Sequence, residues 1–231
     1  MDSKKLPPRL ALIADMVPVD TKLVDVGTDH GLLPIWLLQE GRIVSAIASD
    51  IRPGPLSRAR ANASENGTEN IRFVLCDGLD SISPQEADTI VIAGMGGETI
   101  ASILSSAPWS LKKVLILQPM SRPEALRSFL CSSGLRICED RLVQDNGKIY
   151  SVIKALKGEP LALSDAELCV GPFELISGQP LFQAHIGHWT SKVQNSLIGL
   201  SRASREVEST RIGHLKRVYS QLLEMTNTFT E

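Results

Sequence analysis

Short apolar runs rich in β-branched residues alternate with segments of helical periodicity along the first two thirds of the chain. Each run ends at Gly, Asp or another turn residue, which is typical of a strand that leads into a loop. These runs predict strands over residues 23–27, 46–50, 71–75, 89–93 and 114–117. Apolar residues three and four positions apart predict helices over 9–17, 32–40, 53–66, 98–104 and 123–132.

The pattern changes after residue 132. Two runs, 135–143 and 148–154, flank the turn sequence Asp145-Asn146-Gly147 and predict a β-hairpin. Nearly continuous apolar strands such as 114–117 suit a parallel sheet that is covered on both faces. Five strand–helix units followed by a hairpin therefore predict an α/β fold, a Rossmann-like doubly wound sheet with an antiparallel last strand.

A boundary follows the hairpin at Lys157-Gly158-Glu159-Pro160. From Leu181 onward the chain has no proline, and apolar residues keep three- and four-residue spacings on both sides of a break near 201–209. This spacing predicts two antiparallel, coiled-coil-like helices. We therefore expect two domains, residues 1–157 and residues 158–231.

Composition narrows the class of protein. The 231 residues suffice for one α/β domain of about 150 residues and a smaller helical one. Because the chain has neither an apolar run near the roughly 18 residues of a membrane span nor the apolar core of a secretion signal, we expect a cytoplasmic protein. Its four cysteines form no CxxC pair and show no zinc spacing with His, so we expect reduced thiols and no metal. The net charge of −2 gives no overall nucleic-acid signal.

Chemistry-bearing residues follow four of the predicted strands. The first turn is Gly27-Thr28-Asp29-His30-Gly31, and the second strand ends in Asp50, 23 positions after Gly27. The third strand runs into Cys76-Asp77-Gly78, and the fourth into Gly94-Met95-Gly96-Gly97. Since the carboxyl ends of parallel strands meet at one edge of a sheet, four such turns predict a single ligand crevice. Any one of them alone is more often an ordinary turn.

The first turn departs from the dinucleotide pattern GxGxxG, because Asp29 stands where the second glycine is expected. A carboxylate there would repel a pyrophosphate and would tolerate a cationic ligand. S-adenosylmethionine carries a sulfonium and an α-amino group and has no phosphate, so it is the expected cofactor. Asp50 suits the ribose hydroxyls, and Asp77 suits the adenine amino group. The candidate cofactor-binding residues are Gly27, Thr28, Gly31, Asp50, Ile51, Cys76, Asp77, Gly78, Gly94 and Met95.

Four stretches carry a family resemblance: LVDVGTDHGLLP at 23–34, ASDIRPGPL at 48–56, IAGMGG at 92–97 and LQP at 117–119. The combination of GTDHG with GMGG is specific. From Arg9 to about Ala155 the chain resembles the bacterial tRNA adenine-N1 methyltransferases of the TrmK family. The resemblance implies a class I S-adenosylmethionine-dependent fold. It also implies methyl transfer to N1 of adenosine 22 in the D-arm of tRNA.

Three residues are candidates for catalysis on this resemblance. Asp29 would hold the adenine amino group and favour the cationic product; alternatively it binds the methionine amino group or caps the following helix. His30 would contact the adenine or the tRNA backbone, or merely fix the turn. Gln118 would bond an adenine edge, or merely satisfy the end of a strand.

Positive charge gathers in the C-terminal region. Residues 185–219 hold six Lys and Arg against two Glu, a local net charge of about +4. This asymmetry fits a face that contacts phosphates, and a solvated helix face is the alternative. The candidate tRNA contacts are Arg9, Lys192, Arg202, Arg205, Arg211 and Lys216. No feature of the sequence indicates an obligate protein partner.

Other functions stay open from the residues alone. The chain is alternatively a methyltransferase for another RNA position or for a small molecule. An NAD-dependent oxidoreductase is disfavoured by Asp29 and by the missing GxGxxG pattern. A non-catalytic protein that senses a nucleotide is the remaining class.

Overall fold

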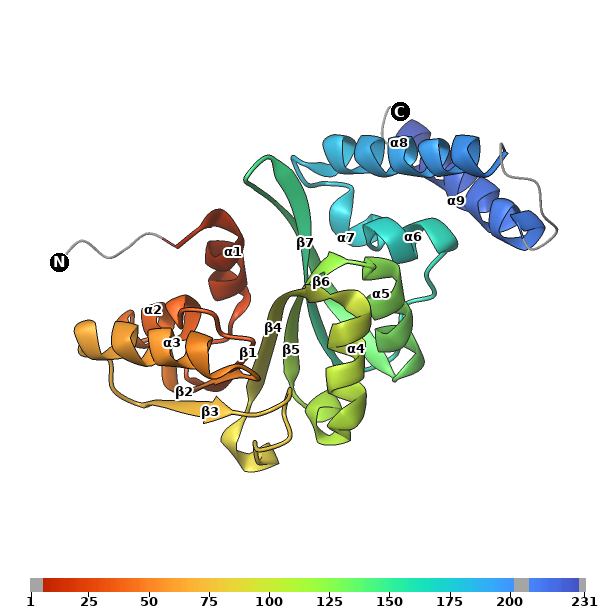
Figure 1. Ribbon diagram of the computed structural model, residues 1–231. Coiled ribbons are helices and arrows are strands. Elements are labelled where there is room, and N and C mark those ends of the chain that lie inside the picture. Colours follow the sequence, from red (N-terminus) through yellow and green to blue (C-terminus); the bar gives the residue numbers. More distant parts are fainter. Residues whose placement is uncertain (1–5, 202–207, 229–231) are drawn as a thin grey trace.

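The computed structural model describes residues 6–201 and 208–228 (Figure 1). Its sheet has the strand order β3-β2-β1-β4-β5-β7-β6. The strands are β1 (Thr21–Val26), β2 (Ile43–Asp50), β3 (Ile71–Leu75), β4 (Thr89–Gly96), β5 (Val114–Ser121), β6 (Leu135–Asp145) and β7 (Lys148–Lys157). β1 to β5 are parallel, and β7 lies antiparallel between β5 and β6. The predicted α/β class, with its antiparallel last strand, is confirmed.

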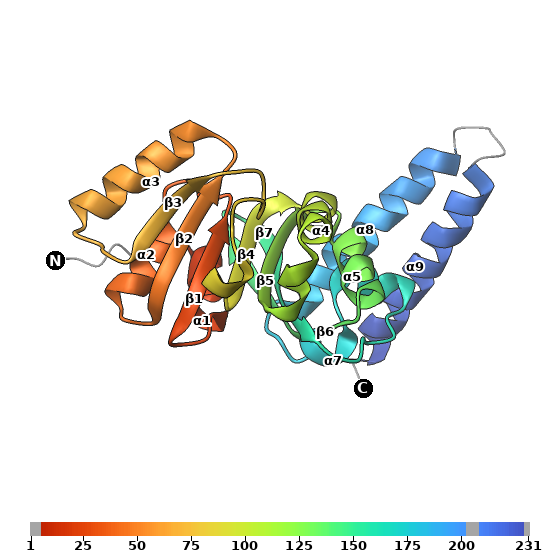
Figure 2. The same cartoon turned by 90° about the horizontal axis from the view of Figure 1, so that it is seen from below.

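Helices cover both faces of this sheet (Figure 2). They are α1 (Pro8–Met16), α2 (Leu32–Gln39), α3 (Pro53–Glu65), α4 (Gly97–Ser106) and α5 (Pro123–Ser132), with short 3-10 turns η1 (Pro84–Glu86) and η2 (Pro108–Lys112). Successive residues of the central strands point to opposite faces of the sheet. In β1, Leu23 packs in the cluster of α1 and α2, whereas Val24 packs in the cluster of α4 and α5. Strands buried on both faces explain their nearly continuous apolar runs.

The predicted strands 89–93 and 114–117 are too short. β4 and β5 continue their pairing through Met95 with Pro119 and Gly96 with Ser121, so the glycine-rich turn is the irregular end of a strand. Pairing with a neighbouring strand decides where a strand ends, and the local sequence does not contain that information. The predicted helices agree with the observed ones to within two residues at each end.

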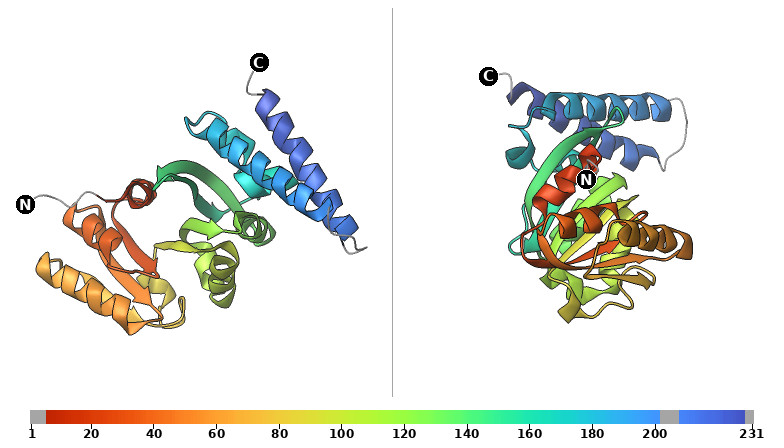
Figure 3. Two further views of the ribbon diagram at one scale, coloured as in Figure 1. Left: turned by 45° about the horizontal axis from the view of Figure 1, so that its top comes forward. Right: turned by 90° about the vertical axis from the view of Figure 1, so that its left-hand side faces the viewer.

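The C-terminal region folds into four helices within the described residues: α6 (Asp165–Val170), α7 (Phe173–Ile176), α8 (Phe182–Ser201) and α9 (Glu208–Thr228). α8 and α9 form the predicted antiparallel hairpin, which projects beside the sheet (Figure 3). Their shared core includes Phe182, Ile186, Val218 and Leu222. The sequence did not predict α6 and α7, which pack on α5 and β6 and attach the hairpin to the sheet. No helix of the described segments is long and apolar enough to span a membrane.

A buried ion pair holds this attachment. Arg127 of α5 is fully buried, and its Nε and Nη2 lie 2.9 and 2.8 Å from Asp140 Oδ2 on β6. Its Nη1 donates to the carbonyls of Leu168 and Cys169, 2.9 and 3.0 Å away, at the end of α6. Ser151 of β7 bonds both partners. Burial raises the pKa of Asp140, and the adjacent guanidinium opposes that rise. One side chain thus ties α5, β6, β7 and α6 together.

We expect the substitution Arg127→Met to lower the free energy of unfolding by about 3–5 kcal/mol, because it leaves the carboxylate of Asp140 buried without its partner. Urea unfolding followed by circular dichroism measures this loss. The control is Arg141→Met, which breaks the exposed ion pair with Asp15 and should cost less than about 1 kcal/mol. Equal losses in the two variants would contradict the role assigned to Arg127.

Candidate functional site

A cavity of about 700 Å³ opens at the carboxyl edge of the parallel strands. It lies where the strand order reverses, because β2 and β3 follow to one side of β1 while β4 and β5 follow to the other. The loops after β1 and β4 diverge at such a point and leave a crevice for a ligand. The loops after β1 to β4, the start of α1 and residues of α4 line the cavity.

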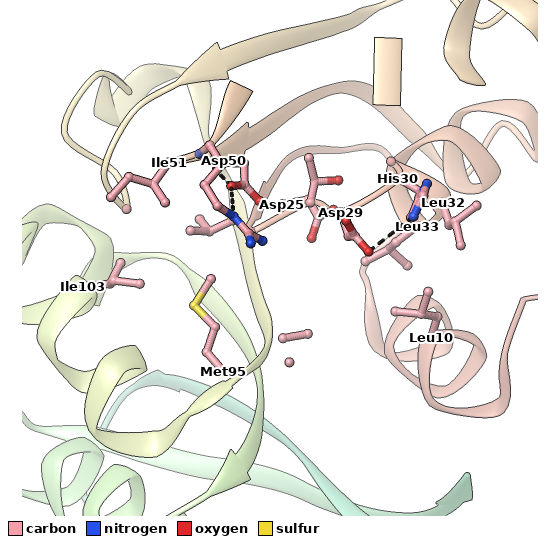
Figure 4. A pocket seen from close by; sticks show the side chains of 18 of the residues that line it. Leu10, Asp25, Asp29, His30, Leu32, Leu33, Asp50, Ile51, Met95 and Ile103 are labelled. Atoms are coloured by element: carbon pink, nitrogen blue, oxygen red, sulfur yellow. Dashed lines mark hydrogen bonds and ion pairs between the residues drawn. The ribbon is translucent and has the colours of Figure 1, made fainter. Parts of the chain in front are cut away.

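All ten candidate cofactor-binding residues line this one cavity, together with Asp29, His30 and Arg9. The four turns recognised in the sequence therefore meet in space, although 67 positions separate Gly27 from Gly94. Figure 4 shows Asp25, Asp29 and Asp50 on the side formed by β1 and β2, with Met95 and Ile103 facing them. Their ligand contacts stay a prediction, since the geometry fixes only their positions.

The first turn is held in place by its backbone. The amides of Gly27 and Thr28 donate to the carbonyl of Ser49, 2.8 and 3.0 Å away, which locks the turn onto β2. Gly27 has a φ of +77°, and a Cβ atom there would lie 2.3 Å from Met95 Cε. The positive φ favours glycine here, and a side chain at this position would also displace the flexible end of Met95.

Two buried carboxylates line the inner part of the cavity. Asp25 and Asp50 are 8% and 7% exposed. Oδ1 of Asp50 accepts a hydrogen bond from the Arg52 amide at 2.8 Å, and the Arg52 Nε lies 3.6 Å away. Burial raises the pKa of Asp25 to about 6; the Thr28 hydroxyl opposes this rise, and the nearby charge of Asp50 adds to it. A cationic ligand would relieve this accumulation of negative charge.

The sequence reading missed Asp25 as a site residue. Its signal is a single carboxylate inside an apolar strand, two residues before the turn glycine. Buried carboxylates need a partner, so such a residue at the carboxyl end of a strand marks a ligand site or a polar network.

Asp29 and His30 lie at the mouth of the cavity. The side chains are 64% and 44% exposed, and His30 Nε2 lies 3.4 Å from Asp29 Oδ2. Arg58 of α3 donates to Asp29 Oδ1 at 3.0 Å. The helix-capping alternative for Asp29 is wrong, because the N-cap of α2 is Gly31 and no side chain caps that helix end.

Gln118 lies outside the cavity lining and is fully buried. Its Oε1 accepts from Arg9 Nη1 at 2.6 Å and from the Gly94 amide at 3.1 Å, while its Nε2 donates to the Pro119 carbonyl. In this arrangement Gln118 holds the residues of the wall and does not itself face a ligand.

Arg9, near the start of α1, is held by three other side chains. Its side chain is 25% exposed, its Nε lies 3.7 Å from Asp145 Oδ2, and its guanidinium lies 5.7 Å from the centre of the Tyr150 ring. These contacts, with that to Gln118, fix a positive charge at one side of the cavity.

The other candidate tRNA-contacting cations belong to the C-terminal region. Lys192 is exposed on α8, and Arg211 and Lys216 are exposed on α9. Arg202 and Arg205 lie outside the described residues. In the described segments, no group of three or more His, Cys, Asp or Glu residues is arranged to hold a metal ion.

The residues of the cavity fit S-adenosylmethionine. Its volume is within the range of small-molecule sites. The carboxylates Asp25, Asp29 and Asp50 suit a sulfonium, an amine and a ribose diol, and would repel the phosphates of a dinucleotide.

Comparisons with known proteins agree with this geometry. The family model described as a methyltransferase domain matches residues 6–153. The chain is 32% identical over 204 residues to the tRNA (adenine(22)-N(1))-methyltransferase of Bacillus subtilis, a match that covers 85% of this chain and 84% of that protein.

Solved structures extend the likeness over the helical region. The B. subtilis tRNA methyltransferase TrmK superposes with a TM-score of 0.86 at 28% identity, and the match covers 96% of this chain and 98% of that one. A Streptococcus pneumoniae protein crystallised with S-adenosyl-L-methionine gives 0.78 at 33% identity, covering 91% and 98%. The resemblance inferred from the sequence is therefore confirmed, and the chain belongs to the methyltransferase-domain family and, within it, to the bacterial tRNA (adenine(22)-N(1))-methyltransferases.

Proposed function

We propose that this protein transfers a methyl group from S-adenosylmethionine to N1 of adenosine 22 in the D-arm of tRNA. The observation that carries the proposal is the single cavity that gathers four strand-end turns and four carboxylates at the switch point of the sheet. The B. subtilis relative, which matches 85% of this chain, is a tRNA (adenine(22)-N(1))-methyltransferase, and this supports the substrate and the position. Because tRNA is its substrate, we place the protein in the cytoplasm.

The chain offers a partner for each part of the cofactor. Asp50 would accept from the ribose hydroxyls, and Asp77 from the adenine amino group. Gly27 and Thr28 would leave room for the methionine portion, with Asp25 or Asp29 near its amino group. When bound, the cofactor supplies an electrophilic methyl group on a positively charged sulfur.

The reaction requires little acid–base catalysis by the protein. N1 of adenine carries a lone pair, so no proton has to leave before it attacks, and the methylated base becomes a cation. The protein must orient the base and exclude water. A carboxylate at the cavity mouth favours a developing positive charge, and the exposed Asp29 has the position to provide it.

The chain divides its work in this proposal. Residues 1–157 hold the cofactor and the chemistry, since every cavity-lining residue precedes Lys157. Residues 158–231 supply most of the grip on tRNA, through the cations around the α8–α9 hairpin. A stacked adenosine has to be extruded from the D-arm at a cost of a few kcal/mol, and phosphate contacts elsewhere would offset that cost.

The first test uses Asp50→Ala and measures both cofactor affinity and methyl transfer to unmodified tRNA. Losing two charge-assisted hydrogen bonds to the ribose should cost about 2–4 kcal/mol, or roughly 30- to 800-fold in the calorimetric affinity for S-adenosylmethionine. Methyl transfer at low cofactor concentration should fall in parallel. The matched control is Asp15→Ala, which removes an exposed carboxylate of α1 and should leave both readouts unchanged. Unchanged affinity in Asp50→Ala would remove this residue from the site.

A second test concerns the C-terminal cations. If Lys192, Arg202, Arg205 and Arg211 contact about four phosphates, log affinity for tRNA should fall with log salt at a slope near −3 to −4. Changing all four to Gln should remove most of that slope and leave cofactor affinity unchanged. Filter binding of tRNA across a salt series measures it. An unaltered slope would make the hairpin a structural element and would move the tRNA surface elsewhere.

A further inference from the structure

A second cavity, of about 470 Å³, lies beside the first. It is lined by the carboxyl end of β5, the turn between β6 and β7, and the first half of α8; we name it the β7–α8 cleft. The two cavities open at the ends of adjacent parallel strands, since Met95 of the first pairs with Pro119 of the second. Neighbouring strands lie about 4.8 Å apart, so the linings of the two cavities are adjacent at this pair of strand ends.

The lining of this cleft is basic. It contains four Lys or Arg and two His, and no Asp or Glu. Two of the cations are already matched, because Arg127 pairs with Asp140 and Arg122 pairs with Glu98 and Glu124. Lys148 and Lys192 are exposed, and neither forms an ion pair within the described part of the chain. An anion entering the cleft would meet two ammonium groups and no carboxylate among the lining residues.

An aromatic ring stands in the same cleft. Trp189 of α8 is partly buried, and it packs against the core of the helical region, which fixes its position. The Lys192 ammonium lies over the indole ring, 4.1 Å from its centre, so this flexible side chain has to swing aside for a base to stack on that face. Sites that bind unpaired nucleotides commonly combine an aromatic ring with nearby cations. The ring stacks on a base, and the cations contact the phosphate.

The two cavities are connected by contacts. Arg9 lines the first cavity and packs over the ring of Tyr150, which lines the cleft. The tip of the β6–β7 hairpin stands between α1 and α8 in both Figure 1 and Figure 3. Arg9 and Tyr150 therefore lie between the two cavities, and an RNA strand that ran from one cavity to the other would cross them.

We propose that the β7–α8 cleft receives one unstacked nucleotide of the tRNA next to the methylated adenosine, with its base on Trp189 and its phosphate near Lys148 and Lys192. This inference rests on the proposed function. Opening a stacked arm at one adenosine disturbs its neighbours as well. Capturing a neighbour on an aromatic ring returns part of that cost, so the cleft assists extrusion of the target base.

The test compares three variants with unmodified tRNA as substrate. Trp189→Leu keeps an apolar side chain against the helical core and removes the stacking surface. It should lower kcat/KM for tRNA by about 5- to 150-fold, the loss expected for one stacked base. Trp189→Phe, which keeps an aromatic ring at this position, should retain most of the parent's activity. Trp109→Leu is the matched control, since Trp109 is a partly buried ring in η2, outside both cavities, and should leave kcat/KM unchanged. Calorimetric affinity for S-adenosylmethionine should stay the same in all three.

A charge variant gives an independent readout. Lys148→Gln should reduce the salt slope of tRNA binding by about 0.7 to 0.9, the value of one phosphate contact. Lys112→Gln, at the η2 end of the sheet, should leave the slope unaltered. If Trp189→Leu does not fold, Lys148→Gln decides the question, with Lys112→Gln as its control.

The outcomes distinguish failure of the proposed role of the cleft from failure of the proposed function. If the parent protein methylates tRNA and both Trp189→Leu and Lys148→Gln behave like the parent, the proposed role of the cleft is wrong and the proposed function stands. A parent protein that binds S-adenosylmethionine and transfers nothing to tRNA overturns both.

Discussion

The site depends on one constraint of the fold, the reversal of strand order between β1 and β4. Parallel strands bring their carboxyl ends to one edge, and the reversal separates the loops there. The turn at Gly27 lines this crevice, and the ends of β1 and β2 supply Asp25 and Asp50. Moving any of these groups by one strand position would turn its side chain to the other face of the sheet.

Charge complements this geometry. Carboxylates gather inside the first cavity, where burial raises the pKa of Asp25, and cations gather in the β7–α8 cleft next to it. Arg9 stands between the two, held by Gln118, Asp145 and Tyr150. A cationic cofactor on one side and a polyanionic substrate on the other match this distribution.

The features that could be predicted from the sequence are those with a local signal, such as turn residues and helical periodicity. Turn residues after apolar runs located ten cavity-lining positions, and periodicity located the α8–α9 hairpin. Gln118 shows what this reasoning could not decide: an amide at a strand end fitted either contact with a base or satisfaction of the strand end, and its partners are Arg9, 109 positions away, and Gly94. Arg127 and Asp140 likewise gave no local signal, because their pairing depends on how β6 packs on α5. Long-range partners of this kind emerge only when the elements are assembled.

The most direct test of the account maps the modified nucleotide. An unmodified tRNA transcript is incubated with the pure protein and S-adenosylmethionine, and methylated positions are located by reverse transcription and by mass spectrometry of nuclease fragments. Methylation at N1 blocks base pairing, so we expect a new stop at adenosine 22 that is absent when a guanosine replaces this adenosine. A methyl group at another position, or transfer that persists on the guanosine transcript, would contradict it.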